Sequence, residues 1–157
     1  MAAAARIASI VGSYESIEPQ VSNFFKRYRN LGPRERHTLA ETAYTVLRER
    51  HRLSHLAQSG QGALERRLSI LAWQGQGAFL AGALGPNEKQ WLAGIQQIDM
   101  STLPEKQRHN LPDWLVQPLK DQLGEEFWPM VASLNGQAPL DLRVNTFKMK
   151  REEALQE

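Results

Sequence analysis

Side chains that commonly carry out catalysis are sparse in this sequence of 157 residues. There is no cysteine, which excludes disulfides, thiolate metal ligands and a cysteine nucleophile together. Among the four histidines, only His51 and His55 have a spacing that could place two ligands on one helix face. Neither belongs to a His-Glu-x-x-His signature, although Glu49 is near. The sequence therefore predicts no catalytic, metal-binding or cofactor-binding residue in this chain.

Positive charge is the more informative feature. Residues 1–67 contain 11 Lys and Arg against 6 Asp and Glu, a net charge of +5, whereas residues 68–157 contain 8 against 11, a net charge of −3. A basic region indicates an anionic partner such as RNA, because guanidinium and ammonium groups bind phosphate. A solvated helical surface is the alternative interpretation. The candidate RNA-binding residues of this region are Lys26, Arg27, Arg29, Arg34, Arg36, Arg48, Arg50 and Arg52.

These cations divide into two kinds by their spacing. Arg36 and Arg48 are placed to face a neighbouring helix, where an arginine can pair with a carboxylate such as Glu41, so a structural role is favoured for both. The other positions are predicted to be exposed and to face RNA: Lys26, Arg27, Arg29, Arg50 and Arg52.

Hydrophobic periodicity predicts the helices that position these side chains. Gly32 is expected to take a left-handed cap position, and Pro33 to open the longest helix. Trp73, Trp91, Trp114 and Trp128 lie on the apolar stripes and are predicted to be core residues. The short connections predict an all-α bundle. Its five helices are expected over residues 1–14, from Pro19 to the stop at Leu31-Gly32, and over 33–56, 63–80 and 88–98.

The following residues have a different character. Residues 99–111 are polar and without periodicity, which predicts a linker. A helical stretch begins at Pro112, is expected to break at Pro118, and ends at Gly124. Another helix, with Glu125 and Glu126 in its first turn, closes at Asn135-Gly136.

Residues 139–148 then alternate with a period of two, with Leu140, Leu142 and Val144 on one face, which predicts a half-buried β-strand. A lone strand leaves its backbone groups unsatisfied. We therefore expect either that the chain is a fragment of a longer protein or that this strand pairs with another chain. Arg143, Asn145 and Lys148 lie on or near the opposite face and are further RNA-binding candidates.

Three stretches resemble one protein family. Leu31-Gly32-Pro33-Arg34-Glu35-Arg36, followed by Glu41, Tyr44 and Leu47-Arg48, resembles a motif of the NusB-like helical domain, with Glu35 in place of the usual Asp. That domain occurs in the antitermination factor NusB and at the start of bacterial RNA (cytosine-5) methyltransferases of the Fmu/Sun/nucleolar-protein family. Pro112-Asp113-Trp114-Leu115 with Gly124, and the stretch 139–146, are similar to segments that follow the bundle in those methyltransferases but not in NusB.

The resemblance implies a NusB-like RNA-binding domain over residues 1–99, a linker over 100–111, and the start of the methyltransferase region over 112–157. In the family, a later doubly wound domain binds S-adenosylmethionine, and two cysteines there act on the cytosine ring. Ribosomal RNA and that catalytic domain are the partners implied, so this chain is expected to be non-catalytic by itself.

The function expected is therefore to bind and orient RNA for a cytosine-5 methyltransferase. The alternatives are a NusB-like antitermination or interaction scaffold that docks a ribosomal or transcription protein, and a complete helical regulator. No run of 18 apolar residues is present, which predicts no membrane span, and the amino-terminal residues do not fit a secretory leader. A cytoplasmic location is expected.

Overall fold

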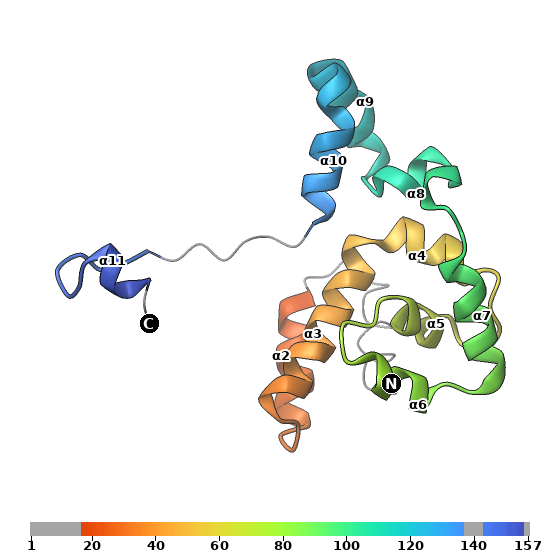
Figure 1. The fold of residues 1–157 in the computed structure, drawn as a ribbon, viewed down its shortest axis with the longest axis horizontal. Coiled ribbons are helices and arrows are strands. Elements are labelled where there is room, and N and C mark those ends of the chain that lie inside the picture. Colours follow the sequence, from red (N-terminus) through yellow and green to blue (C-terminus); the bar gives the residue numbers. More distant parts are fainter. Residues whose placement is uncertain (1–16, 137–142, 156–157) are drawn as a thin grey trace.

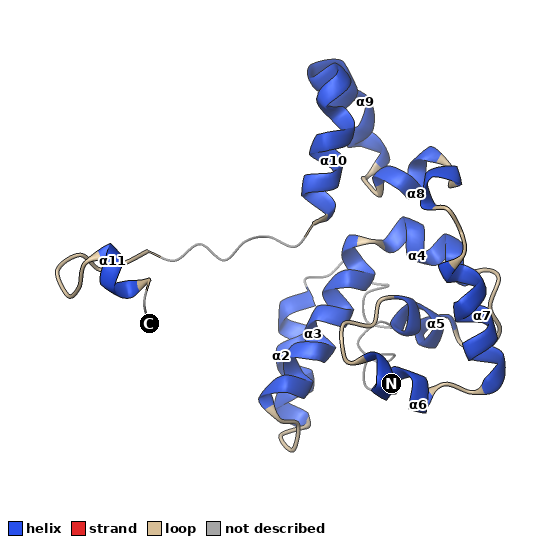
Figure 2. Cartoon of the chain, viewed as in Figure 1, coloured by secondary structure: helices blue, strands red, loops and turns tan. Residues whose placement is uncertain are grey.

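Helices form every regular element in the part of the chain that the structure describes, residues 17–136 and 143–155 (Figures 1 and 2). This computed structural model confirms the all-α fold class for those residues. The helix predicted over residues 1–14 lies outside them. The elements are α2 (Ile17–Arg27), α3 (Pro33–Arg48), α4 (Arg50–Ala57), α5 (Leu64–Leu71), α6 (Gly77–Ala83), α7 (Pro86–Gln96), η1 (Met100–Thr102), α8 (Glu105–His109), α9 (Asp113–Leu123), η2 (Gly124–Glu126), α10 (Phe127–Asn135) and α11 (Arg151–Ala154).

The main core is formed by α2, α3, α4 and α5. Leu39, Ala43 and Val46 follow one another at helical spacing along α3 and are buried. They belong to one cluster with residues of the three other helices, and α2 lies beside α3 (Figure 1). The buried members of this core are Ile17, Val21, Leu39, Ala43, Val46, Leu53, Ala57, Leu68 and Ala72.

The corner between α2 and α3 is shaped by Gly32 and Pro33. Gly32 has φ −71° and ψ 166°, so the predicted left-handed conformation is wrong, and Gly32 is instead the N-cap of α3. Its N–H donates to Oε2 of Glu35 at 2.7 Å, and Pro33 occupies the first helical position as expected. Glu35 therefore has a local role, because it satisfies a backbone donor that the helix cannot satisfy itself.

The helix predicted over residues 33–56 is two helices, α3 and α4, and the prediction of one continuous helix is wrong. Glu49 has φ −108° and ψ 23°, and it is both the C-cap of α3 and the N-cap of α4. The chain changes direction there (Figure 1). Periodicity did not reveal the break because Leu53 and Leu56 are buried at helical spacing just as the apolar residues of α3 are.

The helix predicted over residues 63–80 is also interrupted, between α5 and α6. Gly75 lies so close to its neighbours that a Cβ there would come within 2.5 Å of Trp73 Cζ2 and 2.8 Å of Thr38 Cγ2. The N–H of Gln74 donates to Oγ1 of Thr42 at 3.3 Å. The loop is therefore held against α3 by a close backbone approach that helical spacing alone does not indicate.

An ion pair joins α5 to α7. Arg66 Nε and Glu88 Oε1 are 2.5 Å apart, and Arg66 Nη2 donates to Oε2 of Glu88 at 2.8 Å, which makes the pair bidentate. The hydrogen bond from Arg66 lowers the pKa of the Glu88 carboxyl to about 2. Arg66 also donates to the carbonyl oxygen of Ala83, so α6 is held at its carboxyl end.

The segment predicted as a linker contains helical structure. It holds η1 and α8, and Leu103 is buried in a second core with Leu56 and Ile95. Residues 100–111 therefore pack on α4 and α7 rather than running free between two units. The division of the chain at this segment stays a prediction.

Residues 111–136 form a third core, in which Leu111, Phe127 and Val131 are buried. Pro118 lies inside α9, which is continuous, so the predicted break is wrong. Its ring removes one backbone donor. The carbonyl that would have accepted from this position belongs to Trp114, whose side chain is 75% exposed, so water can satisfy it.

The strand predicted over residues 139–148 is not present where the structure describes the chain. Residues 139–142 lie outside the described residues, whereas residues 143–145 have no regular structure and 146–148 form a turn. The backbone oxygen of Asn145 accepts from Lys148 N at 2.9 Å, and its side-chain oxygen accepts from Phe147 N at 3.1 Å. Local bonds thus satisfy these groups where no neighbouring strand is available.

Candidate nucleic-acid interface

A basic groove lies where α2 meets α3. It is open to solvent, has a volume of about 530 Å³, and is lined by Ser22, Phe25, Lys26, Arg29 and Arg36. Ser22, Phe25 and Lys26 follow one another at spacings of three and one residues, which places them on one face of the end of α2. Arg29 lies in the turn that follows this helix. Its lining contains no carboxylate, so the groove has the charge required of a phosphate-binding surface.

Arg36 holds the corner that shapes this groove. Its Nε donates to the carbonyl oxygen of Leu31 at 2.9 Å, and its Nη2 donates to the carbonyl oxygen of Arg29 at 3.2 Å. The guanidinium lies over the ring of Phe25, 5.6 Å from its centroid. Arg36 therefore has the contacts of a structural residue, with backbone carbonyls as its acceptors in place of the Glu41 carboxylate suggested by the sequence.

The remaining candidates form two groups at opposite ends of α3. Lys26, Arg27, Arg29 and Arg34 are exposed at the α2–α3 end, and of these Lys26 and Arg29 line the groove. Arg48, Arg50 and Arg52 lie at the other end, about 24 Å away for a helix of 16 residues. The structure thus separates residues that the sequence treated as a single basic set.

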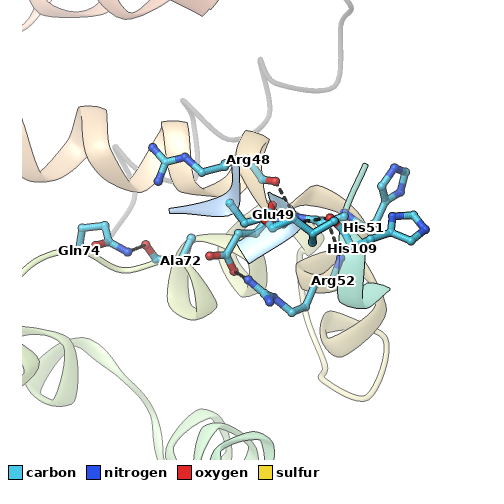
Figure 3. Close-up of polar contacts among 10 residues, drawn as sticks. Arg48, Glu49, His51, Arg52, Ala72, Gln74 and His109 are labelled. Carbon is cyan, nitrogen blue, oxygen red and sulfur yellow. Dashed lines mark hydrogen bonds and ion pairs between the residues drawn. The ribbon is translucent and has the colours of Figure 1, made fainter. Parts of the chain in front are cut away.

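Within the second group, the charge of Arg52 is shared with an acid. Arg52 Nη2 lies 2.5 Å from Glu49 Oε2, and Nε donates to the same oxygen at 3.1 Å. Figure 3 shows these side chains at the junction of α3 and α4. Arg50 is exposed. The groove at the α2–α3 corner is therefore the stronger anion-binding candidate.

Asn110 organises the same junction, and sequence reasoning missed it. Its side-chain oxygen accepts from His51 N at 2.9 Å and from Arg52 N at 3.2 Å, and its side-chain nitrogen donates to the carbonyl oxygen of Arg48. It thereby caps the end of α3 and the beginning of α4 together. Asn110 has φ 58°, a left-handed conformation that asparagine tolerates better than most residues. An Asn between a polar stretch and Leu-Pro was the available signal.

His109, beside it, is a buried histidine. Its Nδ1 accepts from Leu111 N at 3.0 Å, which requires an unprotonated nitrogen. Burial is the main cause that lowers the pKa of His109, and Lys120 and His51 add to it, while Glu105 and Asp113 oppose it. The ring is therefore a neutral packing element. No group of three or more His, Asp and Glu side chains in the described ranges is arranged to hold a metal ion.

The carboxyl-terminal candidates do not join the groove. Arg143 and Lys148 are exposed, and the side-chain oxygen of Asn145 is used in the local turn. In Figure 1 this stretch lies beside α11, apart from α2 and α3. Their role in RNA binding stays a prediction.

The tryptophans depart from the sequence prediction in two of four cases. Trp73 and Trp91 are half-buried, and the ring of Trp73 stacks on Phe79 with centroids 5.7 Å apart. By contrast, Trp114 is 75% exposed and Trp128 is 40% exposed, so their assignment to the core is wrong. The small third core of α9 and α10 is filled by Phe127, Val131 and Leu111 and leaves both indoles outside.

Comparison with known families gives one match. Residues 111–157 match the family described as "Methyltr_RsmF/B-like, ferredoxin-like domain". No curated protein and no solved structure matches the chain. The matched residues begin at the buried Leu111 and include α9, α10 and α11.

This match confirms the resemblance to the rRNA cytosine-5 methyltransferases of the Fmu/Sun family. Residues 111–157 are similar to the ferredoxin-like domain that the family model describes. The likeness of the preceding helices to a NusB-like domain was inferred from motifs and stays a prediction.

Proposed function

We propose that this chain is the RNA-binding, substrate-orienting region of an S-adenosylmethionine-dependent rRNA cytosine-5 methyltransferase, and that it is non-catalytic by itself. The family match supports the methyltransferase relationship. The single observation that carries RNA binding is the groove of Lys26, Arg29 and Arg36, whose lining lacks any carboxylate.

In this proposal the groove binds the sugar-phosphate backbone. Lys26 and Arg29 are exposed and can reach successive phosphates, while Arg36 is fixed by Leu31, Arg29 and Phe25 and keeps the corner open. Arg27 and Arg34 are also exposed at this end of α2 and α3 and add to its positive charge. Such contacts set the position of the RNA without reading its sequence.

Methyl transfer itself is assigned to a catalytic domain outside residues 1–157. S-adenosylmethionine binding in this family is expected to need a doubly wound sheet in a later domain. The sequence also has no cysteine for attack on the ring. The role of this chain is therefore to deliver RNA to that domain, in the cytoplasm where we place the ribosomal substrate.

The test is a titration of a fluorescent 20-nucleotide single-stranded RNA of mixed sequence at several salt concentrations. We expect affinity to fall steeply with salt, and the variant K26Q/R27Q/R29Q to reduce the slope of log affinity against log salt by about 2, since three phosphate contacts are lost. The matched control is N87D/K89E, at exposed positions of α7. Both variants change the net charge by −3, the first by three losses of +1, the second by −1 and −2.

Equal slopes for the two variants would contradict the proposal, because the effect would then belong to net charge and not to the groove. Absence of binding at low salt would also contradict it, and would favour the scaffold that docks a ribosomal or transcription protein.

A further inference from the structure

A second groove is lined by residues of α4, η1, α8 and α10 and shares no lining residue with the groove at the α2–α3 corner. Figure 1 shows the ribbons of α8 and α10 apart from α2. The second groove is open at the surface and has a volume of about 410 Å³. Arg52 of α4, Met100 of η1 and Arg108 of α8 face Trp128 and Asn135 of α10 across it. It therefore joins the helices before residue 110 to the family-matched segment.

Arg108 and Trp128 form a stacked pair in this groove. The guanidinium carbon of Arg108 lies 4.5 Å from the centroid of the Trp128 ring. Nη1 of Arg108 donates to the carbonyl oxygen of Ser101 at 3.4 Å, whereas Nε is buried with no hydrogen-bond partner among the described residues. Trp128 is 40% exposed, whereas its neighbour Phe127 on α10 is buried.

The indole is held in one orientation before any ligand arrives. Its ring meets the buried ring of Phe127 edge-on, with centroids 5.2 Å apart and an interplanar angle of 75°. Arg108 fixes it from the other element. A flat, partly open aromatic surface that is already ordered loses little side-chain entropy when it binds.

The chemistry of the lining selects a flat, anionic ligand. Two guanidinium groups border the groove, and no carboxylate lines it. The charge of Arg52 is shared with Glu49 outside the lining, so Arg108 is the cation on which the site depends. Nucleobases in single-stranded RNA stack on aromatic rings and on guanidinium planes, and they carry a phosphate within reach of a neighbouring cation. Asn135 directs its side-chain nitrogen to the carbonyls of His109 and Val131, so it does not offer that donor to a base edge.

We propose that this groove binds one nucleobase of single-stranded RNA, stacked on the Trp128–Arg108 pair. The site goes beyond the proposed function, because it contacts a base on a different face from the backbone-binding groove. Stacking tolerates every base, so the site increases affinity for unpaired RNA and gives little sequence preference.

The test compares oligoadenylate of six nucleotides with a six-unit abasic ribose-phosphate chain of equal charge. We expect the native protein to bind the adenylate more tightly, and W128L to lose that preference by roughly 5- to 100-fold while its affinity for the abasic chain is unchanged. W128F, which keeps an aromatic face, is expected to retain most of the preference. W114L is the matched control, since Trp114 is more exposed than Trp128 but does not line the groove.

Retention of the full preference by W128L, or an equal loss in W114L, overturns the proposal, and a partner protein would then be the better occupant. The backbone-binding groove is tested separately, because K26Q/R27Q/R29Q is expected to weaken both oligomers equally. If W128L does not fold, native protein labelled with 5-fluorotryptophan gives a second measurement. The Trp128 resonance, assigned with W128F, must shift with adenylate and not with the abasic chain; an unshifted resonance overturns the proposal.

Discussion

The side-chain oxygen of Asn110 accepts a hydrogen bond from the backbone N–H of His51, 59 residues earlier in the chain, at 2.9 Å. The same oxygen accepts from Arg52 N, and the amide nitrogen donates to the carbonyl of Arg48. One amide thus satisfies backbone groups at the ends of two helices. It is the reason why α3 and α4 can separate at Glu49 without leaving these groups unpaired.

Replacement of Asn110 by Ala is expected to lower the free energy of unfolding by about 2–3 kcal/mol, because the caps are lost and a left-handed φ is imposed on alanine. N110G keeps the backbone freedom and loses only the side-chain bonds, so it should lose less. Urea denaturation followed by circular dichroism measures both. A glycine variant as stable as the native protein would show that the side-chain bonds contribute nothing.

Replacement of Gly75 by Ala should also destabilise the protein, by about 1–3 kcal/mol, because the new methyl group would meet the ring of Trp73 and the side chain of Thr38. Gly82, within α6, has no neighbouring atom within 4 Å of the position of a Cβ. G82A should therefore stabilise by up to about 1 kcal/mol through helix propensity. The opposite signs are read from thermal denaturation, and equal effects would contradict the close approach at Gly75.

The contribution of the Arg66–Glu88 ion pair to the free energy of unfolding should depend on pH. The pKa of Glu88 is lowered to about 2 in the folded protein, so its contribution is complete above the ordinary glutamate range near 4.5 and is lost as pH falls through 2. E88Q is expected to cost about 1–2 kcal/mol at pH 7, after allowance for the partial exposure of both side chains.

The difference between native protein and E88Q should shrink toward pH 2 in urea unfolding curves. E125Q, at an exposed position of η2, serves as the control and should show no loss at pH 7. A constant difference between native protein and E88Q at all pH values would exclude the ion pair as its source.

His109 should make the protein less stable in mild acid. Its pKa is lowered in the folded state by burial, so the unfolded chain takes up a proton first as pH falls below the ordinary histidine value of 6.5. The contribution of the neutral ring is therefore complete above 6.5 and decreases as pH falls toward the lowered pKa. We expect H109Q to have a smaller change in urea midpoint between pH 7.5 and 5.5 than the native protein.

The control is H37Q, since His37 is exposed on α3. It should reproduce the native pH dependence. The prediction for His109 fails if H109Q and H37Q change the pH dependence equally.

Sequence reasoning located the helices of the bundle but not the points where they break. The apolar residues of α3 and α4 share one period, so nothing local marks Glu49. The break between α3 and α4 depends on Asn110, which reaches the junction only through tertiary contacts. Likewise, the interruption after α5 depends on the contact of Gly75 with Trp73 and Thr38. At Pro118 the sequence predicted a break that does not occur, because an exposed turn of α9 accommodates the proline.

For the candidate interface, the sequence predicted that basic residues would form it. It did not predict which of them lie together in the structure. Arg36 was expected to be structural, and its carbonyl partners agree with that expectation. Arg52 was expected to be free for RNA but is paired with Glu49, three residues before it. Trp128 was assigned to the core because its helix has apolar residues on more than one face, and only the packing of Phe127 inward determines which face is buried.

The position of Asn110 has a consequence for the order in which the chain assembles. The junction of α3 and α4 can acquire its caps only after a loop of nearly sixty residues has closed, and loop closure costs conformational entropy that must be met before the new bonds are formed. During synthesis, helices α2 to α5 would therefore form before Asn110 is available, and the junction of α3 and α4 would then be solvated. Residues beyond 99 complete the bundle as it folds, so removing them would expose the junction to hydrogen exchange even where the apolar core stays intact.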